Sequence, residues 1–340
     1  MIREAIHALV AGQDLERETA RAAMDDIMSG EATEAQVAGL LVALRLKGET
    51  VDEMVGLVES MRAHGTTIEA PPGAVDTCGT GGDGSGTFNI STAAALVMRG
   101  AGATVAKHGN RAASSACGSA DVLEALGVAI SLPASAAQEC LERTGIVFLL
   151  APVYHPAMRH AVVPRRELGV RTVFNLLGPL ANPARVKRQA VGVGAPEASE
   201  KMAHVLAEIG HERALVFHGA GGLDELSTEG ASVVYDVTGG RVTSFRLDPA
   251  ELDLQPAPRE EILGGDASRN AAIVHSVLEG HVGPRRDVVL LNAAAGLVAA
   301  GLVPTVRDGL VMAAESIDGG AAVDALEQLV SVSTELAAKH

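Results

Sequence analysis

The chain has 340 residues, of which 47% are hydrophobic and 20% are charged. This length and composition predict two domains, or one large α/β domain with a smaller partner, built around a packed core. The formal net charge of −15 and the lack of a basic run argue against a protein that binds nucleic acid. The three cysteines have no paired or zinc-like spacing, and no segment resembles a signal peptide or a membrane span, so we expect a cytoplasmic protein.

Residues 1–70 carry helical patterns only. Apolar residues recur three and four positions apart in 16–28 and in 34–46. A capping box at Thr50 to Glu53 predicts the start of a third helix. Pro71-Pro72-Gly73 then predicts a linker. We therefore expect a small, all-helical N-terminal domain.

Residues 74–340 alternate short β-branched segments with helical patterns. Short buried strands separated by helices predict an α/β domain with a mainly parallel central sheet. The expected strands are 104–106, 128–130, 146–150, 190–193 and 214–217, followed by a hairpin of 233–237 and 241–245. Helices are expected near 269–279 and 309–338, and the apolar stretch 288–303 is expected to be a buried strand that passes into a helix.

A glycine-rich loop dominates residues 76–92, where five of the seventeen positions are glycine. Glycine permits positive φ and a close approach of the backbone, so such a loop can direct several N–H groups towards one ligand. Ser91 and Thr92 precede an apolar run, which predicts an N-cap and a helix. A glycine loop that leads into a helix N-terminus is typical of a phosphate site.

Two other interpretations of this loop are weaker. Gly79, Gly81 and Gly84 match the spacing of the dinucleotide fingerprint, but the helix would begin too late, and Lys107-His108 stands where the ribose-binding acid is expected. A plain structural turn is the other alternative. A phosphate-binding loop of a different kind is favoured.

A second polar loop follows the predicted strand 104–106. Residues 107–115 contain two cations, an imidazole, an amide and two hydroxyls, and Gly118-Ser119-Ala120-Asp121 leads into the next helix. Ligands of α/β sheets bind at the carboxyl edge of the strands, where this loop is expected. A binding loop is therefore favoured over an ordinary basic loop.

Together these motifs resemble the anthranilate phosphoribosyltransferase family. The resemblance rests on residues 76–83, 89–92, 107–111 and 118–127, and continues through 165–183 and through His218-Gly219 to Glu225. It covers essentially the whole chain in order. It implies a helical N-terminal dimerisation domain (residues 1–70, with a helical segment near 170–185 joining it) and an α/β catalytic domain (residues 74–340) of the nucleoside phosphorylase and phosphoribosyltransferase type.

The family reaction moves a phosphoribosyl group from 5-phosphoribosyl 1-pyrophosphate to the amine of anthranilate, and it is the second step from chorismate towards tryptophan. The resemblance implies that the donor is held by Gly79, Gly82, Asp83, Thr87, Asn89, Ile90, Ser91, Thr92, Lys107, His108, Gly109, Asn110, Arg111, Ala112, Ala113, Ser114, Ser115 and Ser119. It also implies two Mg²⁺ ions per subunit, with Ser91, Asp224 and Glu225 as ligands. By themselves, two adjacent acids on a surface loop are usually just solvated.

The resemblance places the acceptor, anthranilate, against Gly79, His108, Asn110 and Arg165. A guanidinium can hold a planar carboxylate through two parallel hydrogen bonds, which suits Arg165. Its neighbour Arg166 is expected to be structural. His155 and Ala151-Pro152 are expected to line the acceptor pocket, whereas Pro164 and Met158 have no match in the family pattern. No residue is assigned as a general acid or base.

Two alternatives stay open from the sequence. A pyrimidine-nucleoside phosphorylase would share the helical and α/β architecture and a glycine-rich phosphate loop. A non-catalytic homologue that binds nucleic acid belongs to another class, but the net charge and the intact Asp224-Glu225 argue against it. We expect a homodimer with small-molecule substrates, joined through the helical domain, without a membrane or nucleic-acid partner.

Overall fold

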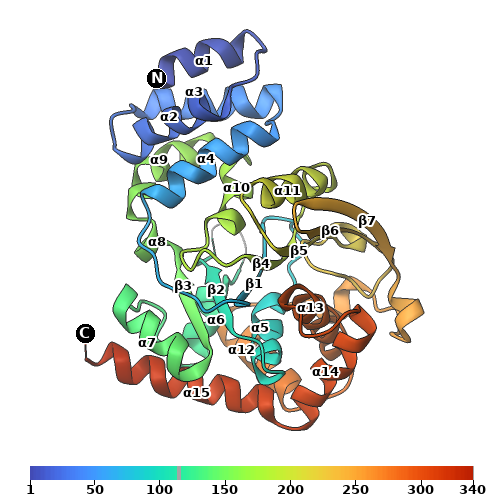
Figure 1. Ribbon diagram of the computed structural model, residues 1–340. Coiled ribbons are helices and arrows are strands. Elements are labelled where there is room, and N and C mark those ends of the chain that lie inside the picture. Colours follow the sequence, from blue (N-terminus) through green and yellow to red (C-terminus); the bar gives the residue numbers. More distant parts are fainter. Residues whose placement is uncertain (113–115, 340) are drawn as a thin grey trace.

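Four helices begin the chain in the computed structural model, which describes residues 1–112 and 116–339 (Figure 1). They are α1 (Ile2–Val10), α2 (Arg17–Met28), α3 (Glu34–Lys47) and α4 (Val51–Ala63). The expected capping box starts α4: the Thr50 hydroxyl accepts a hydrogen bond from the Glu53 N–H, and the Glu53 carboxylate accepts one from the Thr50 N–H. The local sequence therefore fixes where this helix begins.

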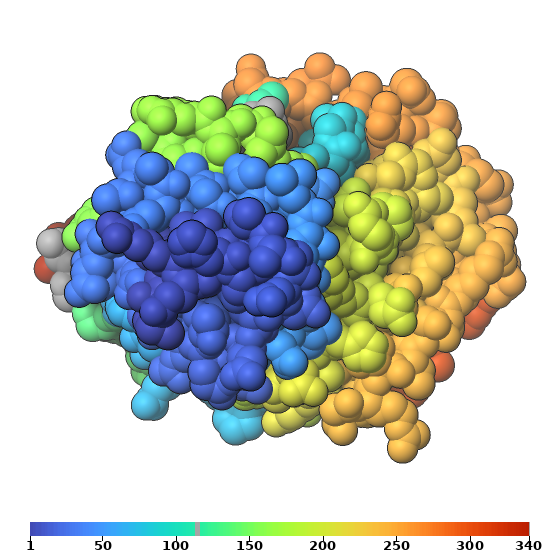
Figure 2. Space-filling model, turned by 90° about the horizontal axis from the view of Figure 1, so that it is seen from above, coloured from blue at the N-terminus to red at the C-terminus, as the bar shows by residue number. Residues whose placement is uncertain are grey.

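Later segments pack against these four helices. They are α9 (Arg159–Leu168), α10 (Phe174–Leu177) and the 3₁₀ helix η2 (Gly178–Ala181). Ala161, Phe174 and Leu177 lie in the same apolar core as Leu40 and Met54 of the N-terminal helices. Figure 2 looks onto the N-terminal helices, in blue, with residues near 160, in green, beside them. The helical layer is thus built from two separate parts of the chain.

A seven-stranded sheet forms the centre of the larger part, in the order β3-β2-β1-β4-β5-β6-β7. The strands are β1 (Val75–Gly79), β2 (Val105–Gly109), β3 (Ile146–Leu150), β4 (Arg188–Gly192), β5 (Arg213–His218), β6 (Ser232–Thr238) and β7 (Arg241–Leu247). Strands β1 to β5 pair in parallel, whereas β6 and β7 form the expected antiparallel hairpin. The expected class, a small helical part with a larger, mainly parallel α/β part, is confirmed.

The sheet separates two apolar cores. Successive side chains of a strand point to opposite faces, so Ala190 and Leu215 join one core, while Val191 and Val216 join the other. The first core is covered by α5 (Ile90–Gly100) and α13 (Pro284–Ala300), among other helices (Figure 1). The second is covered by α11 (Pro196–Glu208) and continues into the N-terminal helices.

The other helices complete the two layers. They are α6 (Ser119–Ala125), α7 (Ala134–Thr144), α8 (Ala151–Tyr154), α12 (Ala267–Leu278), α14 (Val306–Asp318) and α15 (Ala321–Ala337), with the 3₁₀ helices η1 (Pro156–Met158), η3 (Ala220–Gly222), η4 (Pro249–Leu252) and η5 (Arg259–Ile262). No helix within residues 1–112 and 116–339 is long and apolar enough to cross a membrane.

Three of the predicted helices and strands were wrong. Residues 128–130 form no strand, because their N–H groups bond elsewhere. The Val128 N–H donates to the Leu123 carbonyl at the end of α6, and the Ala129 N–H donates to the Ser333 hydroxyl of α15. Residues 288–303 contain no strand, because α13 runs unbroken to Ala300. An apolar run that is buried on all sides has no hydrophobic periodicity by which a helix can be told from a strand. The helix expected over 309–338 is two helices, separated at Gly319 and Gly320.

Candidate active site

The glycine loop lies where the order of the strands reverses. From β1 the chain builds β2 and β3 on one side, and then returns to place β4 on the other side of β1. Ligands of open α/β sheets bind in the crevice outside the carboxyl ends of the strands at such a point. Gly81, Gly82, Gly84 and Gly86 all have φ between 68° and 71°, a region that side chains disfavour, so this loop requires glycine.

Helix α5 starts directly after this loop, at Ile90. The sequence predicted Ser91 and Thr92 as the N-cap, but the residue before the helix is Asn89, and Ser91 lies in the first turn. The Asn89 amide does not cap the helix, since it donates to the Cys117 carbonyl and accepts from Asn270 of α12. Within the first turn, the Ile90 N–H donates to the Phe88 carbonyl and the Thr92 N–H to the Asn89 carbonyl, whereas the Ser91 N–H donates to a partner outside the helix, Glu225.

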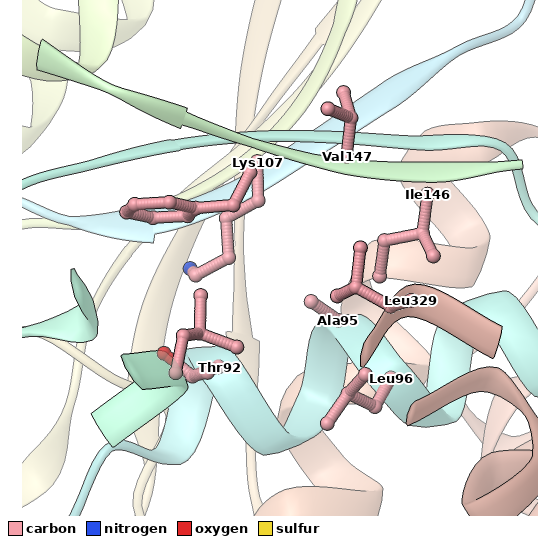
Figure 3. Close-up of a pocket in the computed structure, with 9 residues that line it drawn as sticks. Thr92, Ala95, Leu96, Lys107, Ile146, Val147 and Leu329 are labelled. Atoms are coloured by element: carbon pink, nitrogen blue, oxygen red, sulfur yellow. The ribbon is translucent and has the colours of Figure 1, made fainter. Parts of the chain in front are cut away.

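Lys107 extends from β2 to the start of α5. Its ammonium group donates to the Thr77 carbonyl at 2.6 Å and to the Ser91 hydroxyl at 3.3 Å. Figure 3 shows Lys107 directed at Thr92 across a small gap that is otherwise lined by apolar side chains such as Leu96 and Ile146. Because Lys107 is only 3% exposed, its charge is held in place rather than solvated.

Asp224 and Glu225 meet the glycine loop and the start of α5. The Glu225 carboxylate accepts a hydrogen bond from the Ser91 N–H at 3.1 Å. The Asp224 carboxylate accepts one from the Gly81 N–H at 2.6 Å. The structure thus brings together the two acids and the hydroxyl that the resemblance implied, although these residues lie far apart in the sequence.

Two glycines at the carboxyl ends of neighbouring strands allow this approach. Gly79 ends β1 and Gly192 ends β4, and the two residues pair across the sheet. A Cβ atom on Gly79 would collide with the Asp224 carboxylate, and one on Gly192 with the Asp224 backbone. Asp83 holds the acid segment from the loop side, because its carboxylate accepts from the Asp224 N–H at 3.2 Å.

Both acids have pKa values well above the ordinary range for a carboxylate. Burial and the neighbouring Asp83 raise the pKa of Asp224 to about 7. Burial and Asp224 raise the pKa of Glu225 to about 8, although Lys107 opposes that shift. A bound cation would favour the charged form of both carboxylates.

The oxygen donors here fit Mg²⁺, which prefers carboxylates and hydroxyls and commonly completes its shell with water and substrate phosphates. Within the described residues, no group of three or more His, Cys, Asp and Glu side chains is arranged to hold a metal. Asp224, Glu225 and Ser91 would therefore supply only part of a magnesium shell.

The second loop is folded back on α6. The Asn110 carbonyl accepts from the Ser119 hydroxyl at 3.2 Å, and the Ala112 N–H donates to Asp121 at 2.9 Å. The Arg111 guanidinium makes two hydrogen bonds to Glu124 and one to Asp121, so its charge is already paired. The predicted donor residues Ala113, Ser114 and Ser115 lie outside the described residues.

The expected acceptor residues come from the carboxyl ends of β1 and β2, the α8–η1 junction and α9. The rings of His108 and His155 meet edge to face, with centroids 5.5 Å apart. Burial lowers the pKa of His108 to about 3, so this ring is neutral. Arg165 lies over the Phe174 ring at 5.1 Å, and burial lowers the pKa of its guanidinium. Arg166 is exposed.

The structure also places Pro164 and Met158, which have no family match, and the remaining residues expected at the site. Pro164 lies inside α9, where it is buried, and Met158 ends η1. Ala151 and Pro152 form the first turn of α8. On the donor side, Thr87 pairs with Leu263 in an isolated bridge, which fixes the end of the glycine loop.

Three further groups lie around the site that the sequence did not single out. The Arg171 guanidinium donates to the Gly81 carbonyl at 2.6 Å, although its segment belongs to a quoted motif. Asp76, buried in β1, accepts from Asn182 at 2.8 Å and from Gln189 at 3.3 Å. Asn292, the single amide in an apolar run, lies beside the acid segment. That isolated amide was the one available signal.

Known proteins match the whole length of this chain. Residues 3–65 match the helical bundle domain of a glycosyl transferase family, and residues 71–323 match its α/β domain. The anthranilate phosphoribosyltransferase of Pelotomaculum thermopropionicum is 53% identical over 337 residues, which cover 99% of this chain and 98% of the relative. The chain belongs to the anthranilate phosphoribosyltransferase family. It is therefore a phosphoribosyltransferase, and the nucleoside phosphorylase alternative is set aside.

Solved structures of the family agree in fold. The anthranilate phosphoribosyltransferase of Thermus thermophilus superposes with a TM-score of 0.92 at 44% identity, covering 97% of this chain and 99% of its own. The Saccharomyces cerevisiae enzyme in complex with PRPP and Mg gives a TM-score of 0.90 at 27% identity, with 98% of both chains covered. The yeast enzyme has also been solved with 4-fluoroanthranilate, with a TM-score of 0.88 at 26% identity and 98% coverage of both chains.

Proposed function

We propose that this protein transfers the phosphoribosyl group of 5-phosphoribosyl 1-pyrophosphate to the amine of anthranilate. The products are N-(5-phosphoribosyl)anthranilate and pyrophosphate, and the reaction is the second step from chorismate towards tryptophan. One observation carries the proposal: Asp224 and Glu225 lie against the glycine loop and the start of α5. The arrangement supports the proposal, because two carboxylates lie beside a glycine loop and a helix N-terminus of the kind that binds phosphate.

The donor would be held mainly by charge and backbone. The glycine loop and the N-terminus of α5 would form the anion site. Lys107 adds a fixed positive charge beside Ser91. Hydrogen bonds to charged groups contribute about 1.5–3 kcal/mol each. These contacts supply the binding energy that orients the diphosphate.

Two Mg²⁺ ions per subunit would bind with the donor, held by Ser91, Asp224 and Glu225. When bound, they stabilise the negative charge that develops on the leaving pyrophosphate. A cation at these carboxylates would also offset the burial and the repulsion between acids that raise the pKa of both groups.

The acceptor would be held by Arg165 and the second loop. The half-buried guanidinium of Arg165 suits the carboxylate of anthranilate. His108 is neutral and buried, so it can hydrogen-bond the acceptor without adding a charge. The aromatic amine is itself neutral near pH 7 and needs no prior deprotonation. The proposed catalysis therefore rests on positioning and electrostatics, without a covalent enzyme intermediate.

The loss of anthranilate fluorescence tests the reaction directly, with purified protein, donor and Mg²⁺. We expect turnover that EDTA abolishes and excess Mg²⁺ restores. The double variant Asp224→Asn, Glu225→Gln should lose most of its kcat and change its Mg²⁺ dependence. Full turnover in that variant would remove the metal assignment, and no turnover in the parent protein would remove the function.

Arg165 and Arg166 form a matched pair for the acceptor site, because they are neighbours with different exposure. Arg165→Ala should raise the KM for anthranilate by about tenfold or more, while Arg166→Ala leaves it near the parent value. Equal effects of the two changes would move the acceptor site elsewhere.

A further inference from the structure

Asn292 places an amide in one of the most apolar surroundings of the molecule. It lies in the middle of α13, where residues 288–300 are all buried, and it is 1% exposed. Burying an amide without hydrogen-bond partners is costly. A side chain with this cost is expected to form hydrogen bonds that use its full capacity.

Those hydrogen bonds go to the residue that follows Glu225. The Asn292 Oδ1 accepts from the Leu226 N–H at 2.9 Å, and its Nδ2 donates to the Leu226 carbonyl at 2.9 Å. The same Nδ2 also donates to the Val288 carbonyl, one turn earlier in α13, at 2.8 Å. The amide therefore satisfies both main-chain groups of Leu226, as a neighbouring strand would.

This contact fixes the segment next to the acids. The Leu226 side chain is 1% exposed in the apolar core, so this residue is held by its side chain and by both main-chain groups. On the other side of the acids, the Gly219 N–H donates to the Leu223 carbonyl at 2.9 Å, which closes a short turn. Asp224 and Glu225 are thereby presented between two anchored residues.

Helix α13 also contacts the other half of the site. A Cβ atom on Gly296 would collide with Met98 of α5, so α13 and α5 pack closely there. Helix α5 carries Ser91, whose N–H binds Glu225. One helix thus supports both the acid segment and the helix whose N-terminus these acids face.

We propose that Asn292 is a positioning residue that orients Asp224 and Glu225 towards the start of α5 through the backbone of Leu226. The inference rests on the proposed function, in which these two acids bind magnesium. Side chains that orient metal ligands in this indirect way typically change metal affinity by about 10- to 100-fold when they are removed.

The test compares Asn292→Leu with Ser333→Ala. Leucine keeps a similar volume but removes all three hydrogen bonds. Ser333 of α15 is equally buried but makes its hydrogen bond away from the acid segment. Its hydroxyl accepts from the Ala129 N–H at 3.0 Å. The readouts are binding of Mn²⁺ in the presence of pyrophosphate, followed by electron paramagnetic resonance, the Mg²⁺ dependence of turnover, the KM for anthranilate and the melting temperature.

For Asn292→Leu we expect Mn²⁺ affinity to fall by about tenfold or more, with a matching rise in the Mg²⁺ requirement and little change in the KM for anthranilate. Ser333→Ala should lower only the melting temperature. Folded Asn292→Leu with parental Mn²⁺ affinity would overturn the proposal. If Asn292→Leu does not fold, Asn292→Ser, which keeps one hydroxyl donor, should show a smaller loss of Mn²⁺ affinity, and parental affinity there would equally overturn it.

The double variant Asp224→Asn, Glu225→Gln separates this inference from the proposed function. Loss of Mn²⁺ binding in the double variant together with parental binding in the Asn292 variants would overturn the positioning role alone. Parental Mn²⁺ binding in the double variant would overturn the metal assignment itself, and the role of Asn292 with it.

Discussion

The Glu225 carboxylate accepts a hydrogen bond from the Ser91 N–H at 3.1 Å, across 134 positions of sequence. This bond joins the segment after β5 to the first turn of α5, and so it joins the two sides of the candidate site. The length of this hydrogen bond depends on how closely the segment that carries Asp224 and Glu225 can approach the carboxyl ends of β1 and β4.

Gly192→Ala should separate the acids from the glycine loop, because the added Cβ would collide with the Asp224 backbone. A shift of about 1 Å in catalytic groups can cost about 10²-fold in rate, so we expect a fall in kcat of that order and a higher Mg²⁺ requirement. Gly39→Ala in α3 is the control, because its Cβ would make an ordinary contact with Ile6 at 3.6 Å. Steady-state kinetics with parental kcat in Gly192→Ala would contradict this account of the site.

Arg171→Ala should loosen the glycine loop, because the Arg171 guanidinium donates to the Gly81 carbonyl at 2.6 Å. A hydrogen bond from a charged group contributes about 1.5–3 kcal/mol, so the KM for the phosphoribosyl donor should rise by about tenfold. The control is Arg143→Ala, which removes an exposed ion pair with Glu335 and should leave that KM unchanged. The same KM in both variants would exclude a role for Arg171 in the loop.

His211 should make stability depend on pH. Burial, with Arg62 and Lys187 nearby, lowers the pKa of this buried imidazole from 6.5 to about 3. The unfolded chain therefore binds a proton below pH 6.5 that the folded protein does not. The stabilising contribution is complete above pH 6.5 and is lost as the pH falls towards 3, by about 1.4 kcal/mol per pH unit.

His211→Leu removes this titration. Urea unfolding between pH 7 and pH 4.5 should show a weaker pH dependence in the variant, by about that slope below pH 6. Some dependence should persist, because the pKa of His108 is lowered to about 3 in the same way. Identical pH profiles for the two proteins would show that His211 is protonated equally in the folded and unfolded states.

The helical part should associate with a second copy of the chain. Leu46 of α3 is 83% exposed and Val162 of α9 is 53% exposed, although both helices also contribute to the apolar core. We expect the parent protein to sediment as a dimer and Leu46→Glu or Val162→Glu to sediment as a monomer. Val282→Glu is the control, because Val282 is 88% exposed in the α/β part. A dimer in both of the first two variants would place the interface elsewhere.

The sequence predicted those elements whose signals are local. The capping box at Thr50 and the β-branched hairpin around Gly239-Gly240 lie where the structure has them. Strand β1 was not predicted as a separate strand, because Asp76 and Thr77 are polar. Buried Asp76 accepts hydrogen bonds from Asn182 and Gln189, more than a hundred positions later, and from the His108 N–H. A pattern read over a few residues cannot contain that information.

The same limit applies to the candidate site. The glycine loop and the Lys107 loop could be inferred from their own residues, since the first leads into a predicted helix and the second follows a predicted strand. Asp224 and Glu225 alone indicated a solvated pair, and only the family resemblance connected them to Ser91. Arg171 and Asn292 were missed because their contacts with Gly81 and Leu226 cross the fold and leave no periodic trace in the sequence.

The N-terminal helices and one face of the sheet share an apolar core, which affects how the protein folds during translation. Leu40 and Met54 are buried together with Ala161 and Phe174, and that core continues to Val216 of β5. On the ribosome, the first four helices emerge about a hundred residues before the segments that complete their packing. The apolar faces of these four helices therefore stay exposed to other proteins until more than half of the polypeptide has been made.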